Sequence, residues 1–174
     1  MGQEGRVKYS VAVIVVSDRA ASGVRADRCL PVFEELLADS LFDLKSTHIV
    51  PDESDAICSA LKTCIDQNCD LIMTSGGTGC TERDITPEIT RTLLDKPTPG
   101  VDEAIRRFSS TKSPNAIYSR AISGIAGRSF VVNLPGSPKA VREILGFLLP
   151  TIEHPLGLVA GSITDCETES QRND

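Results

Sequence analysis

Residues 74–79 have the composition and the setting of a phosphate-binding turn. They read Thr-Ser-Gly-Gly-Thr-Gly and follow an apolar run at residues 71–73. Glycines let backbone N–H groups converge on an anion, and a helix that starts beyond them adds positive partial charge. The segment has neither the Gly-Lys-Ser/Thr of a Walker A loop nor the Gly-x-Gly-x-x-Gly spacing of a dinucleotide-binding turn. The sequence therefore predicts a phosphate site outside these two classes, with a simple tight turn as the alternative.

An acidic segment follows directly, because residues 83–88 read Arg-Asp-Ile-Thr-Pro-Glu. Asp84 is placed to hold a metal ion against phosphates on the glycine turn, although it could also be an ordinary turn residue. Thr86, Pro87 and Glu88 are typical of a helix start, with a cap, a proline in the first position and an acid in the first turn. Glu88 could contact a ligand or only stabilise that helix start.

The charge of the chain limits the classes of ligand. The sequence has 174 residues, a net charge of −6 and a pI near 5.0. A nucleic-acid surface would need a basic stripe, so we expect no nucleic-acid partner. An acidic protein that binds phosphates must neutralise them locally, which makes Mg²⁺ the expected ion. The length suits one domain, expected at residues 1–164, followed by a polar, disordered tail at 165–174.

Alternating strand and helix patterns predict the fold. Apolar and β-branched runs predict strands at residues 9–16, 44–50, 69–74 and 129–134. Helical spacing and start signals predict helices at residues 27–39, from residue 52, from residue 86 and from residue 137, with shorter helices and turns over residues 100–126. Asp52 is the expected N-cap of the second helix. This order predicts an α/β three-layer sandwich in which helices flank a mostly parallel central sheet.

The carboxyl ends of the predicted strands carry the candidate site. In open parallel sheets, ligands bind in the crevice beyond these ends. Polar or glycine residues follow all four predicted strands, at 17–18, 51–52, 75–79 and 135–137. We therefore expect these four segments to converge on one pocket. The last of them precedes a helix and would form a second anion site, or only cap that helix.

Cysteines and apolar runs indicate the compartment. Six cysteines stand at positions 29, 58, 64, 69, 80 and 166 without a Cys-x-x-Cys pair, so we expect neither a zinc site nor a disulfide framework. Reduced thiols favour a cytoplasmic protein. The first ten residues are polar, and the longest apolar run, at residues 11–16, is too short to cross a bilayer. We therefore expect no signal peptide and no membrane partner.

Five motifs occur in one order along the chain. They are Val-Ser-Asp-Arg at 16–19 with Ser-Gly at 22–23, Val-Pro-Asp-Glu at 50–53, the paired segments at 74–79 and 83–88, Ser-Arg at 119–120, and Asn-Leu-Pro-Gly-Ser-Pro at 133–138. With these motifs the chain resembles the MogA-type molybdopterin adenylyltransferases, relatives of the G domain of gephyrin, over residues 7–160. The resemblance implies an α/β sandwich assembled as a homotrimer. It also implies transfer of AMP from Mg-ATP to the terminal phosphate of molybdopterin, release of pyrophosphate, and passage of the product to a molybdenum-insertion partner protein.

The same resemblance implies roles for individual residues. Asp52 and Asp84 match the two functionally critical aspartates of the family, so we expect them to be catalytic and to anchor Mg²⁺ directly or through water. The implied substrate-binding residues are Ser17, Asp18, Ser75, Gly76, Gly77, Thr78, Gly79, Glu88, Ser119, Arg120, Asn133, Pro135, Gly136 and Ser137. Arg120 is expected to pair with phosphate, with a structural ion pair as the alternative, and Arg19 and Arg83 are further candidates. The trimer interface is expected on residues 101–127.

The implied reaction suits the residue types of the chain. A phosphate monoester is largely ionised at pH 7, since its second pKa is about 6, so its attack needs no strong general base. The chain agrees with this, having two histidines and no Ser-His-Asp candidate. The obstacle is repulsion between anionic phosphates, which calls for positioning and charge neutralisation. The alternatives are a binding or scaffold domain without catalysis, a molybdopterin-binding paralogue with another nucleotide preference or role, and an unrelated nucleotide-binding α/β domain.

Overall fold

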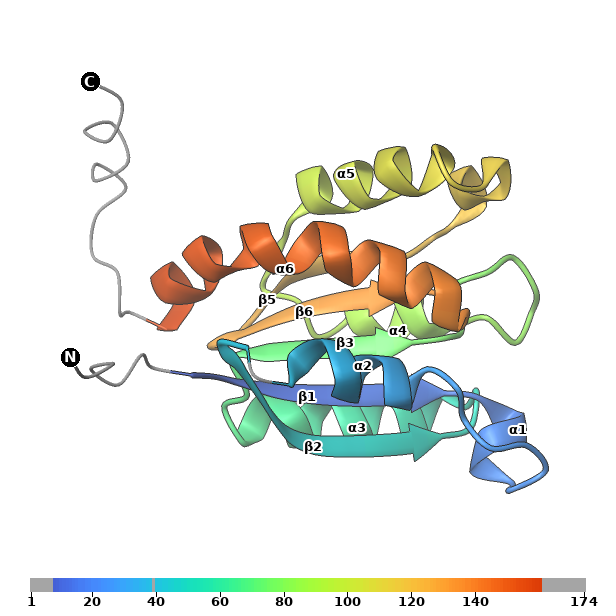
Figure 1. The fold of residues 1–174 in the computed structure, drawn as a ribbon. Coiled ribbons are helices and arrows are strands. Elements are labelled where there is room, and N and C mark those ends of the chain that lie inside the picture. Colours follow the sequence, from blue (N-terminus) through green and yellow to red (C-terminus); the bar gives the residue numbers. More distant parts are fainter. Residues whose placement is uncertain (1–7, 39, 161–174) are drawn as a thin grey trace.

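A six-stranded sheet lies between two layers of helices in the computed structural model, which describes residues 8–38 and 40–160 (Figure 1). The strands are β1 (Tyr9–Val16), β2 (Phe42–Val50), β3 (Leu71–Ser75), β4 (Lys96–Pro97), β5 (Ser123–Ala126) and β6 (Ser129–Leu134). Their order across the sheet is β2-β1-β3-β6-β5-β4. Strands β2, β1, β3 and β6 are parallel, whereas β5 and β4 pair antiparallel at one edge. The predicted α/β sandwich with a mostly parallel sheet is confirmed.

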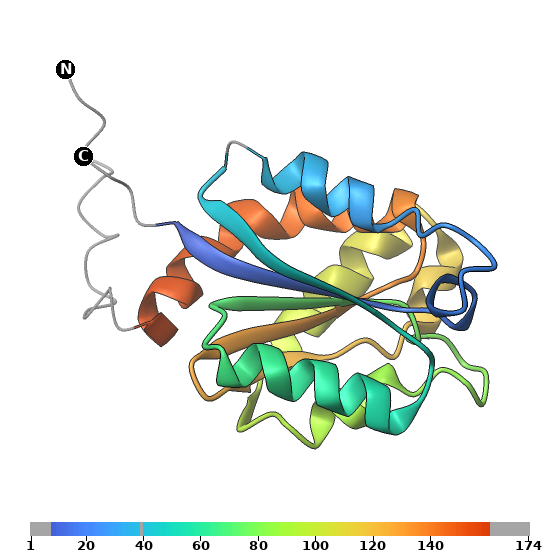
Figure 2. The same ribbon diagram turned by 90° about the horizontal axis from the view of Figure 1, so that it is seen from below.

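The helices divide between the two faces of the sheet (Figure 2). They are α1 (Asp18–Ala21), α2 (Leu30–Leu37), α3 (Ser54–Asp66), α4 (Thr86–Arg91), α5 (Pro99–Ser110), the 3₁₀ helix η1 (Pro114–Tyr118) and α6 (Pro138–Ala160). Helices α2, α5 and α6 cover one face, and α3 and α4 cover the other. Both faces of β1 are buried, since Val13 packs in the core beneath α2, α5 and α6, and Ile14 packs in the core beneath α3 and α4. This explains the unbroken apolar run at residues 11–16.

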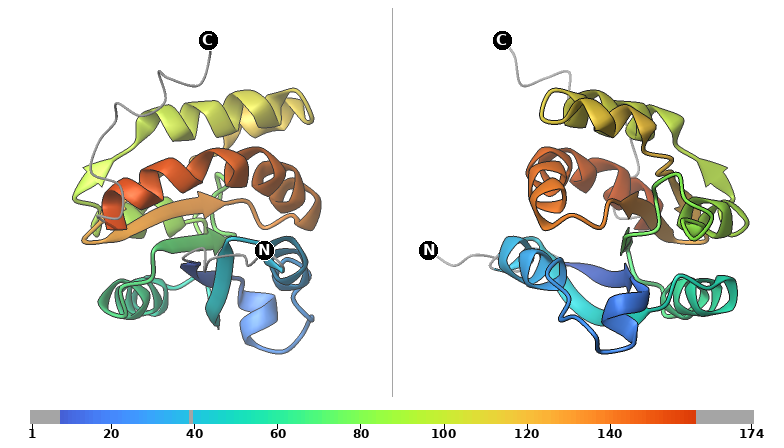
Figure 3. Two further views of the ribbon diagram at one scale, coloured as in Figure 1. Left: turned by 60° about the vertical axis from the view of Figure 1, so that its left-hand side comes forward. Right: turned by 90° about the vertical axis from the view of Figure 1, so that its right-hand side faces the viewer.

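The carboxyl ends of the four parallel strands meet at one side of the molecule. The right-hand view of Figure 3 looks onto this side, where α1, the loop before α4 and the first turn of α6 come together. The chain enters α6 through Ser137, whose carbonyl oxygen accepts the N–H of Val141 at 2.9 Å and whose hydroxyl oxygen accepts that of Ala140 at 3.5 Å. The predicted cap at Ser137 is therefore confirmed.

The stretch 100–126 differs from the prediction of short helices and turns. It contains all but the first residue of the 12-residue α5, the short η1 and then strand β5, which pairs with β6 and β4. The residues of β5, Ser-Gly-Ile-Ala, have weak strand propensity, so pairing with its neighbours determines its conformation. A Cβ at Gly124 would lie 2.6 Å from the carbonyl oxygen of Lys96, which shows how closely the two edge strands approach.

Three predicted helix starts are also corrected. Helix α2 begins at Leu30 rather than at residue 27, and the carboxylate of Asp27 accepts the N–H of Leu30 at 2.5 Å. The N-cap position of α3 is Glu53, and Asp52 instead accepts the N–H of Asp18 on its Oδ2. Thr86 is the first residue of α4 rather than its cap, and its buried hydroxyl has no partner among the described residues.

No helix in residues 8–38 and 40–160 combines the length and the apolar character needed to cross a lipid bilayer. The predicted tail at 165–174 lies outside the described residues, as does Cys166. The five described cysteines, at positions 29, 58, 64, 69 and 80, form no disulfide with one another.

Candidate active site

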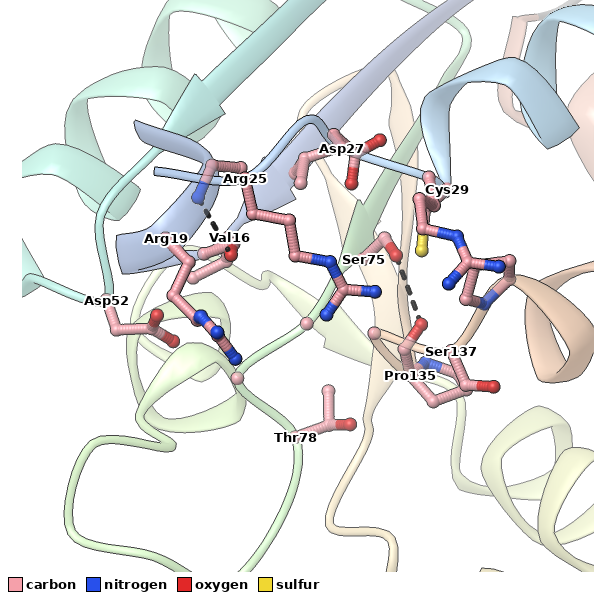
Figure 4. A pocket seen from close by; sticks show the side chains of 18 of the residues that line it. Val16, Arg19, Arg25, Asp27, Cys29, Asp52, Ser75, Thr78, Pro135 and Ser137 are labelled. Carbon is pink, nitrogen blue, oxygen red and sulfur yellow. Dashed lines mark hydrogen bonds between the residues drawn. The ribbon is translucent and has the colours of Figure 1, made fainter. Parts of the chain in front are cut away.

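The segments that follow β1, β2, β3 and β6 border a cavity of about 480 Å³, called here the charged cavity (Figure 4). The predicted convergence of the four segments is confirmed. The predicted site residues that line this cavity are Ser17, Asp52, Ser75, Gly76, Gly77, Thr78, Gly79, Asp84, Pro135, Gly136 and Ser137. The remaining predicted residues lie around it, and each is described below.

Glycine is required at two positions of the turn after β3. Gly76 has φ +112°, and a Cβ there would lie 2.1 Å from the carbonyl oxygen of Val16 at the end of β1. Gly77 has φ +61°, and a Cβ there would lie 2.2 Å from the hydroxyl of Thr86. Both are positions where a side chain would be strained and would collide. The glycines thus let the turn pack directly against its neighbours at the cavity wall.

Asp52 and Asp18 connect the ends of β2 and β1 reciprocally. One oxygen of Asp52 accepts the N–H of Asp18, one oxygen of Asp18 accepts the N–H of Asp52, and both distances are 3.0 Å. Asp18 also binds Arg83, with N–O distances of 2.7 Å, and this hydrogen bonding lowers the pKa of the Asp18 carboxyl. Asp18 and Arg83 therefore hold each other beside the charged cavity and do not line it.

Asp52 and Asp84 sit in different electrostatic environments. Burial raises the pKa of Asp52 above its usual value, and the like charges of Asp18 and Asp84 act in the same direction. Burial also acts to raise the pKa of Asp84, but hydrogen bonds from Thr81 and Gly79 outweigh it and lower the pKa overall. The hydroxyl and N–H of Thr81 donate to Asp84 at 2.6 Å and 2.8 Å. Asp84 is thus firmly held in its ionised form.

Arg120 connects the glycine turn to the segment that carries Asp84. Its guanidinium donates to the carbonyl oxygen of Gly79 at 2.6 Å, to the carbonyl oxygen of Asp84 and to the carboxylate of Glu88. Arg120 and Glu88 do not line the charged cavity. In this structure Arg120 thus adopts the arrangement given above as the alternative, a structural ion pair, and Glu88 is its partner.

A second cavity of about 610 Å³ lies between α5, η1 and α6, and is called here the helical cavity. Four residues line both cavities, namely Thr78, Gly79, Pro135 and Ser137. Apolar groups such as Ile105, Ala121 and Ile144 contribute to its walls, and Ser119 lines it as well. Asn133 reaches its lining from the sheet, where the fully buried amide donates to the hydroxyls of Thr74 and Thr90, each at 2.9 Å. The two cavities therefore meet at the glycine turn.

Residues 12–154 match the profile of the family described as "probable molybdopterin binding domain". The chain belongs to this family. A molybdopterin adenylyltransferase of Helicobacter pylori (strain J99 / ATCC 700824) is 41% identical over 155 residues, 87% of this chain and 88% of that protein. Gephyrin of Dictyostelium discoideum is 34% identical over 176 residues, which cover 95% of this chain and 24% of gephyrin. The solved structure of a molybdopterin biosynthesis enzyme, MoaB of Thermus thermophilus, matches with a TM-score of 0.83 and 42% identity, over 88% of this chain and 97% of that one.

Membership of the molybdopterin-binding domain family confirms the resemblance found in the motifs. The site of this family member also contains residues that the sequence analysis missed. Arg25 and Arg28, on the connection between α1 and α2, line the charged cavity together with Arg19 of α1. The available signal was their spacing, three arginines within ten residues of an otherwise acidic chain. Most of the helical cavity was also missed, because α5 and α6 are distant in sequence.

Proposed function

We propose that this member of the family is a molybdopterin adenylyltransferase, which transfers AMP from Mg-ATP to the terminal phosphate of molybdopterin and releases pyrophosphate. The observation that carries the proposal is the shared wall of two chemically different cavities. The charged cavity supplies arginines, aspartates and a glycine turn, which suit the phosphates of a nucleotide. The helical cavity supplies a mostly apolar surface that also carries the cations Arg106, Lys112 and Lys139, which suits an organic ring system bearing a phosphate.

The shared wall would bring the two substrates together. ATP in the charged cavity and molybdopterin in the helical cavity would both reach Thr78, Gly79 and Ser137. Among the described residues, no hydrogen bond uses the N–H groups of Gly77 and Thr78, so both can donate to phosphate oxygens. Holding the two phosphates in line at this wall would remove much of the entropic cost of their encounter.

The reaction needs no proton transfer from the protein. An oxygen of the molybdopterin phosphate attacks the α-phosphorus of ATP, and a new P–O–P link forms. The bond between the α-phosphorus and the oxygen that bridges to the β-phosphate breaks, and pyrophosphate leaves with its electron pair. The attacking monoester is already ionised near pH 7. The described residues of the charged cavity include no histidine, which agrees with a site that positions and neutralises charge.

The donor set of the charged cavity fits Mg²⁺. Within the described residues, Oδ1 of Asp52 accepts no hydrogen bond, and both bonds from Thr81 to Asp84 go to Oδ2. Glycines keep the space beside them open, because a Cβ at Gly77 would lie 3.3 Å from Oδ1 of Asp52, and one at Gly79 would lie 2.9 Å from Oδ2 of Asp84. No group of three histidine, cysteine or acidic side chains suited to a metal occurs in the described part of the chain. Mg²⁺ typically takes one or two carboxylates together with water and substrate phosphates, and when bound it would neutralise phosphate charge.

The decisive experiment measures pyrophosphate release by the purified protein with ATP, Mg²⁺ and molybdopterin. We expect release only when all three are present. A protein that molybdopterin protects against thermal unfolding, but that releases no pyrophosphate, would be the binding or scaffold domain considered above. Parallel reactions with GTP and CTP would identify a paralogue with another nucleotide preference.

We also propose an oligomeric state, a cellular compartment and a partner protein for the enzyme. We propose a homotrimer, because the motifs resemble a trimeric family and because Ile117 and Tyr118, 59% and 64% exposed, lie within the expected interface at 101–127. Light scattering should then give about three times the 18.6 kDa mass of the chain. We propose that the enzyme acts in the cytoplasm, where ATP is available, and that a molybdenum-insertion protein consumes its product.

A further inference from the structure

Helix α1 and its connection to α2 place three arginines on one side of the charged cavity. Arg19, Arg25 and Arg28 all line this cavity, and none of them lines the helical cavity. Figure 4 shows the side chains of Arg19, from α1, and Arg25, from the connection, extending into the opening toward the side where Thr78 and Pro135 lie. The three guanidinium groups therefore belong to one wall of one cavity.

Within the described residues these three arginines have no carboxylate partner, which is also true of Arg91 and Arg107 outside both cavities. Three exposed or half-exposed arginines form ion pairs, namely Arg83 with Asp18, Arg120 with Glu88, and Arg142 with Glu35. No hydrogen bond or ion pair occupies the guanidinium groups of Arg19, Arg25 and Arg28 within residues 8–38 and 40–160. Asp27 is their acidic neighbour, but its carboxylate accepts the N–H of Leu30. All three guanidinium groups thus keep their donors for a ligand.

The backbone that carries the arginines is held in place. The N–H of Arg25 donates to the carbonyl oxygen of Arg19 at 3.0 Å, and the bond from Leu30 to Asp27 fixes the entry into α2. Asp52 and Asp84 line the same cavity from the segments after β2 and β3. The charged cavity therefore combines a cationic wall with an acidic wall, as an anionic ligand with a bound cation would require.

We propose that Arg19, Arg25 and Arg28 bind the β- and γ-phosphates of ATP and hold them as they leave as pyrophosphate. The inference rests on the proposed function, which places ATP in the charged cavity. The α-phosphorus must lie near Thr78 and Ser137, since the molybdopterin phosphate has to reach it from the helical cavity. The arginines line only the charged cavity, so they face the part of the triphosphate that points away from molybdopterin.

This arrangement would favour bond cleavage. When the bond from the α-phosphorus to its bridging oxygen breaks, the pyrophosphate group gains negative charge. Guanidinium groups that contact it stabilise that charge more strongly than the charge of the bound substrate, which accelerates the reaction. The planar guanidinium is suited to this role because it can donate two parallel hydrogen bonds to a phosphate.

The test uses the single variants Arg19→Gln, Arg25→Gln and Arg28→Gln in the full chain. Calorimetry measures the binding of ATP, AMP and inorganic pyrophosphate, with no need for molybdopterin or turnover. We expect each variant to bind ATP and pyrophosphate about tenfold more weakly and AMP within about twofold of the wild type, since one charge-assisted contact is worth on the order of 1.4 kcal/mol. Lys62→Gln removes one exposed positive charge from α3, away from both cavities, and should change none of the three affinities.

The outcomes separate this inference from the proposed function. Equal losses of affinity for AMP and ATP, or unchanged affinities in all three variants, would overturn the proposed binding of the β- and γ-phosphates by the arginines. This holds even if the wild type adenylylates molybdopterin. If the variants lose affinity for ATP and pyrophosphate but not for AMP, while the wild type shows no adenylylation, the role of the arginines is supported and the proposed adenylyl transfer is rejected. Thermal unfolding confirms that each variant is folded, and Arg25→Lys should recover only part of the lost affinity, because lysine cannot form the bidentate contact.

Discussion

The charged cavity and the helical cavity are lined by different kinds of chemical group. The charged cavity lies beyond parallel strands, and its floor is backbone from glycine turns with aspartates and arginines around it. The helical cavity lies between helices, and most of its walls are side chains of α5, η1 and α6. Backbone N–H groups and fixed charges recognise phosphate in any substrate that carries it, whereas side-chain walls recognise one particular shape.

The difference assigns separate tasks to the two sides of the glycine turn. Under the proposed function, the charged cavity would neutralise the triphosphate, and the helical cavity, whose lining includes Lys112 and Lys139, would select the organic substrate. Changes on the charged side should therefore reduce the rate and nucleotide binding together. Changes on the helical side should alter the Michaelis constant of molybdopterin alone. The four predictions below test this division, beginning with the glycine turn.

The largest effect is expected for Gly77→Val, in the glycine turn next to the shared wall. A Cβ at Gly77 would lie 2.2 Å from the Thr86 hydroxyl, and φ is +61°, so valine would displace the turn. We expect no detectable pyrophosphate release and no binding of ATP, while far-UV circular dichroism still shows the sheet and helices. The matched control is Gly146→Ala on α6, where a Cβ would meet nothing within 4 Å. Wild-type turnover by Gly77→Val would mean that the turn does not contact either substrate.

The next effect is expected for Asp84→Asn on the charged side. Asparagine keeps the size and can still accept the hydrogen bonds from Thr81, but it removes the charge that would hold Mg²⁺. We expect the rate of adenylyl transfer to fall about 100- to 1,000-fold, since removal of one group that stabilises the transition state typically costs this much. Raising the Mg²⁺ concentration should restore part of the rate. A rate near that of the wild type at ordinary Mg²⁺ would rule out a metal role for Asp84.

The charged side could largely be predicted from the sequence, because its structure follows from local rules. Residues 9–16 and 129–134 form strands with the predicted bounds, since both are apolar runs buried on two faces. Glycine and polar residues after such strands must meet at one edge of a parallel sheet. The hydrogen bonding of Asp52 is the exception, because it was predicted to cap α3. Its carboxylate accepts an N–H from a residue 34 positions away, and no local pattern records that contact.

The helical side could not be predicted in the same way, because it depends on packing between distant segments. Ile105 and Ile144 line one cavity from helices that are separated by η1, β5 and β6. Strand β5 has little propensity of its own and is formed by pairing with β6 and β4. Arg25 and Arg28 were missed for another reason. Exposed charges on a loop have no periodicity, and only the fold shows that they line a cavity.

A smaller effect, confined to one substrate, is expected for Ala140→Phe in the first turn of α6. Ala140 lines the helical cavity and not the charged one, so a phenyl ring there would occupy space that we assign to the pterin. We expect the Michaelis constant for molybdopterin to rise about tenfold, which corresponds to about 1.4 kcal/mol, with the affinity for ATP unchanged. Thr151→Phe introduces the same phenyl ring at an exposed position of α6 outside both cavities and should change neither constant. An equal loss of ATP affinity in Ala140→Phe would show that the two cavities are not independent.

The smallest effect is expected for Asp102→Asn, the same chemical change as Asp84→Asn but on α5. Asp102 is 9% exposed and accepts a hydrogen bond from the Ser123 hydroxyl at 2.6 Å. Burial raises the pKa of Asp102 above its ordinary value of 3.8, so the charged form costs stability in the folded protein. Asparagine can accept the same bond without a charge. We expect wild-type turnover and an increase on the order of 1 kcal/mol in the free energy of unfolding at pH 7.

The sign of the pH dependence follows from the raised pKa of Asp102. Between 3.8 and the higher value in the folded state, the folded wild type binds more protons at this site than the unfolded chain does, so its stability falls as pH rises through that window. The asparagine variant lacks this titration. The gain in the free energy of unfolding over the wild type should therefore be absent below pH 3.8 and complete above the raised pKa of Asp102. Urea titrations at several pH values would measure it. A variant that is less stable than the wild type at pH 7, or one that loses turnover as Asp84→Asn does, would mean that the helical side also depends on a fixed negative charge.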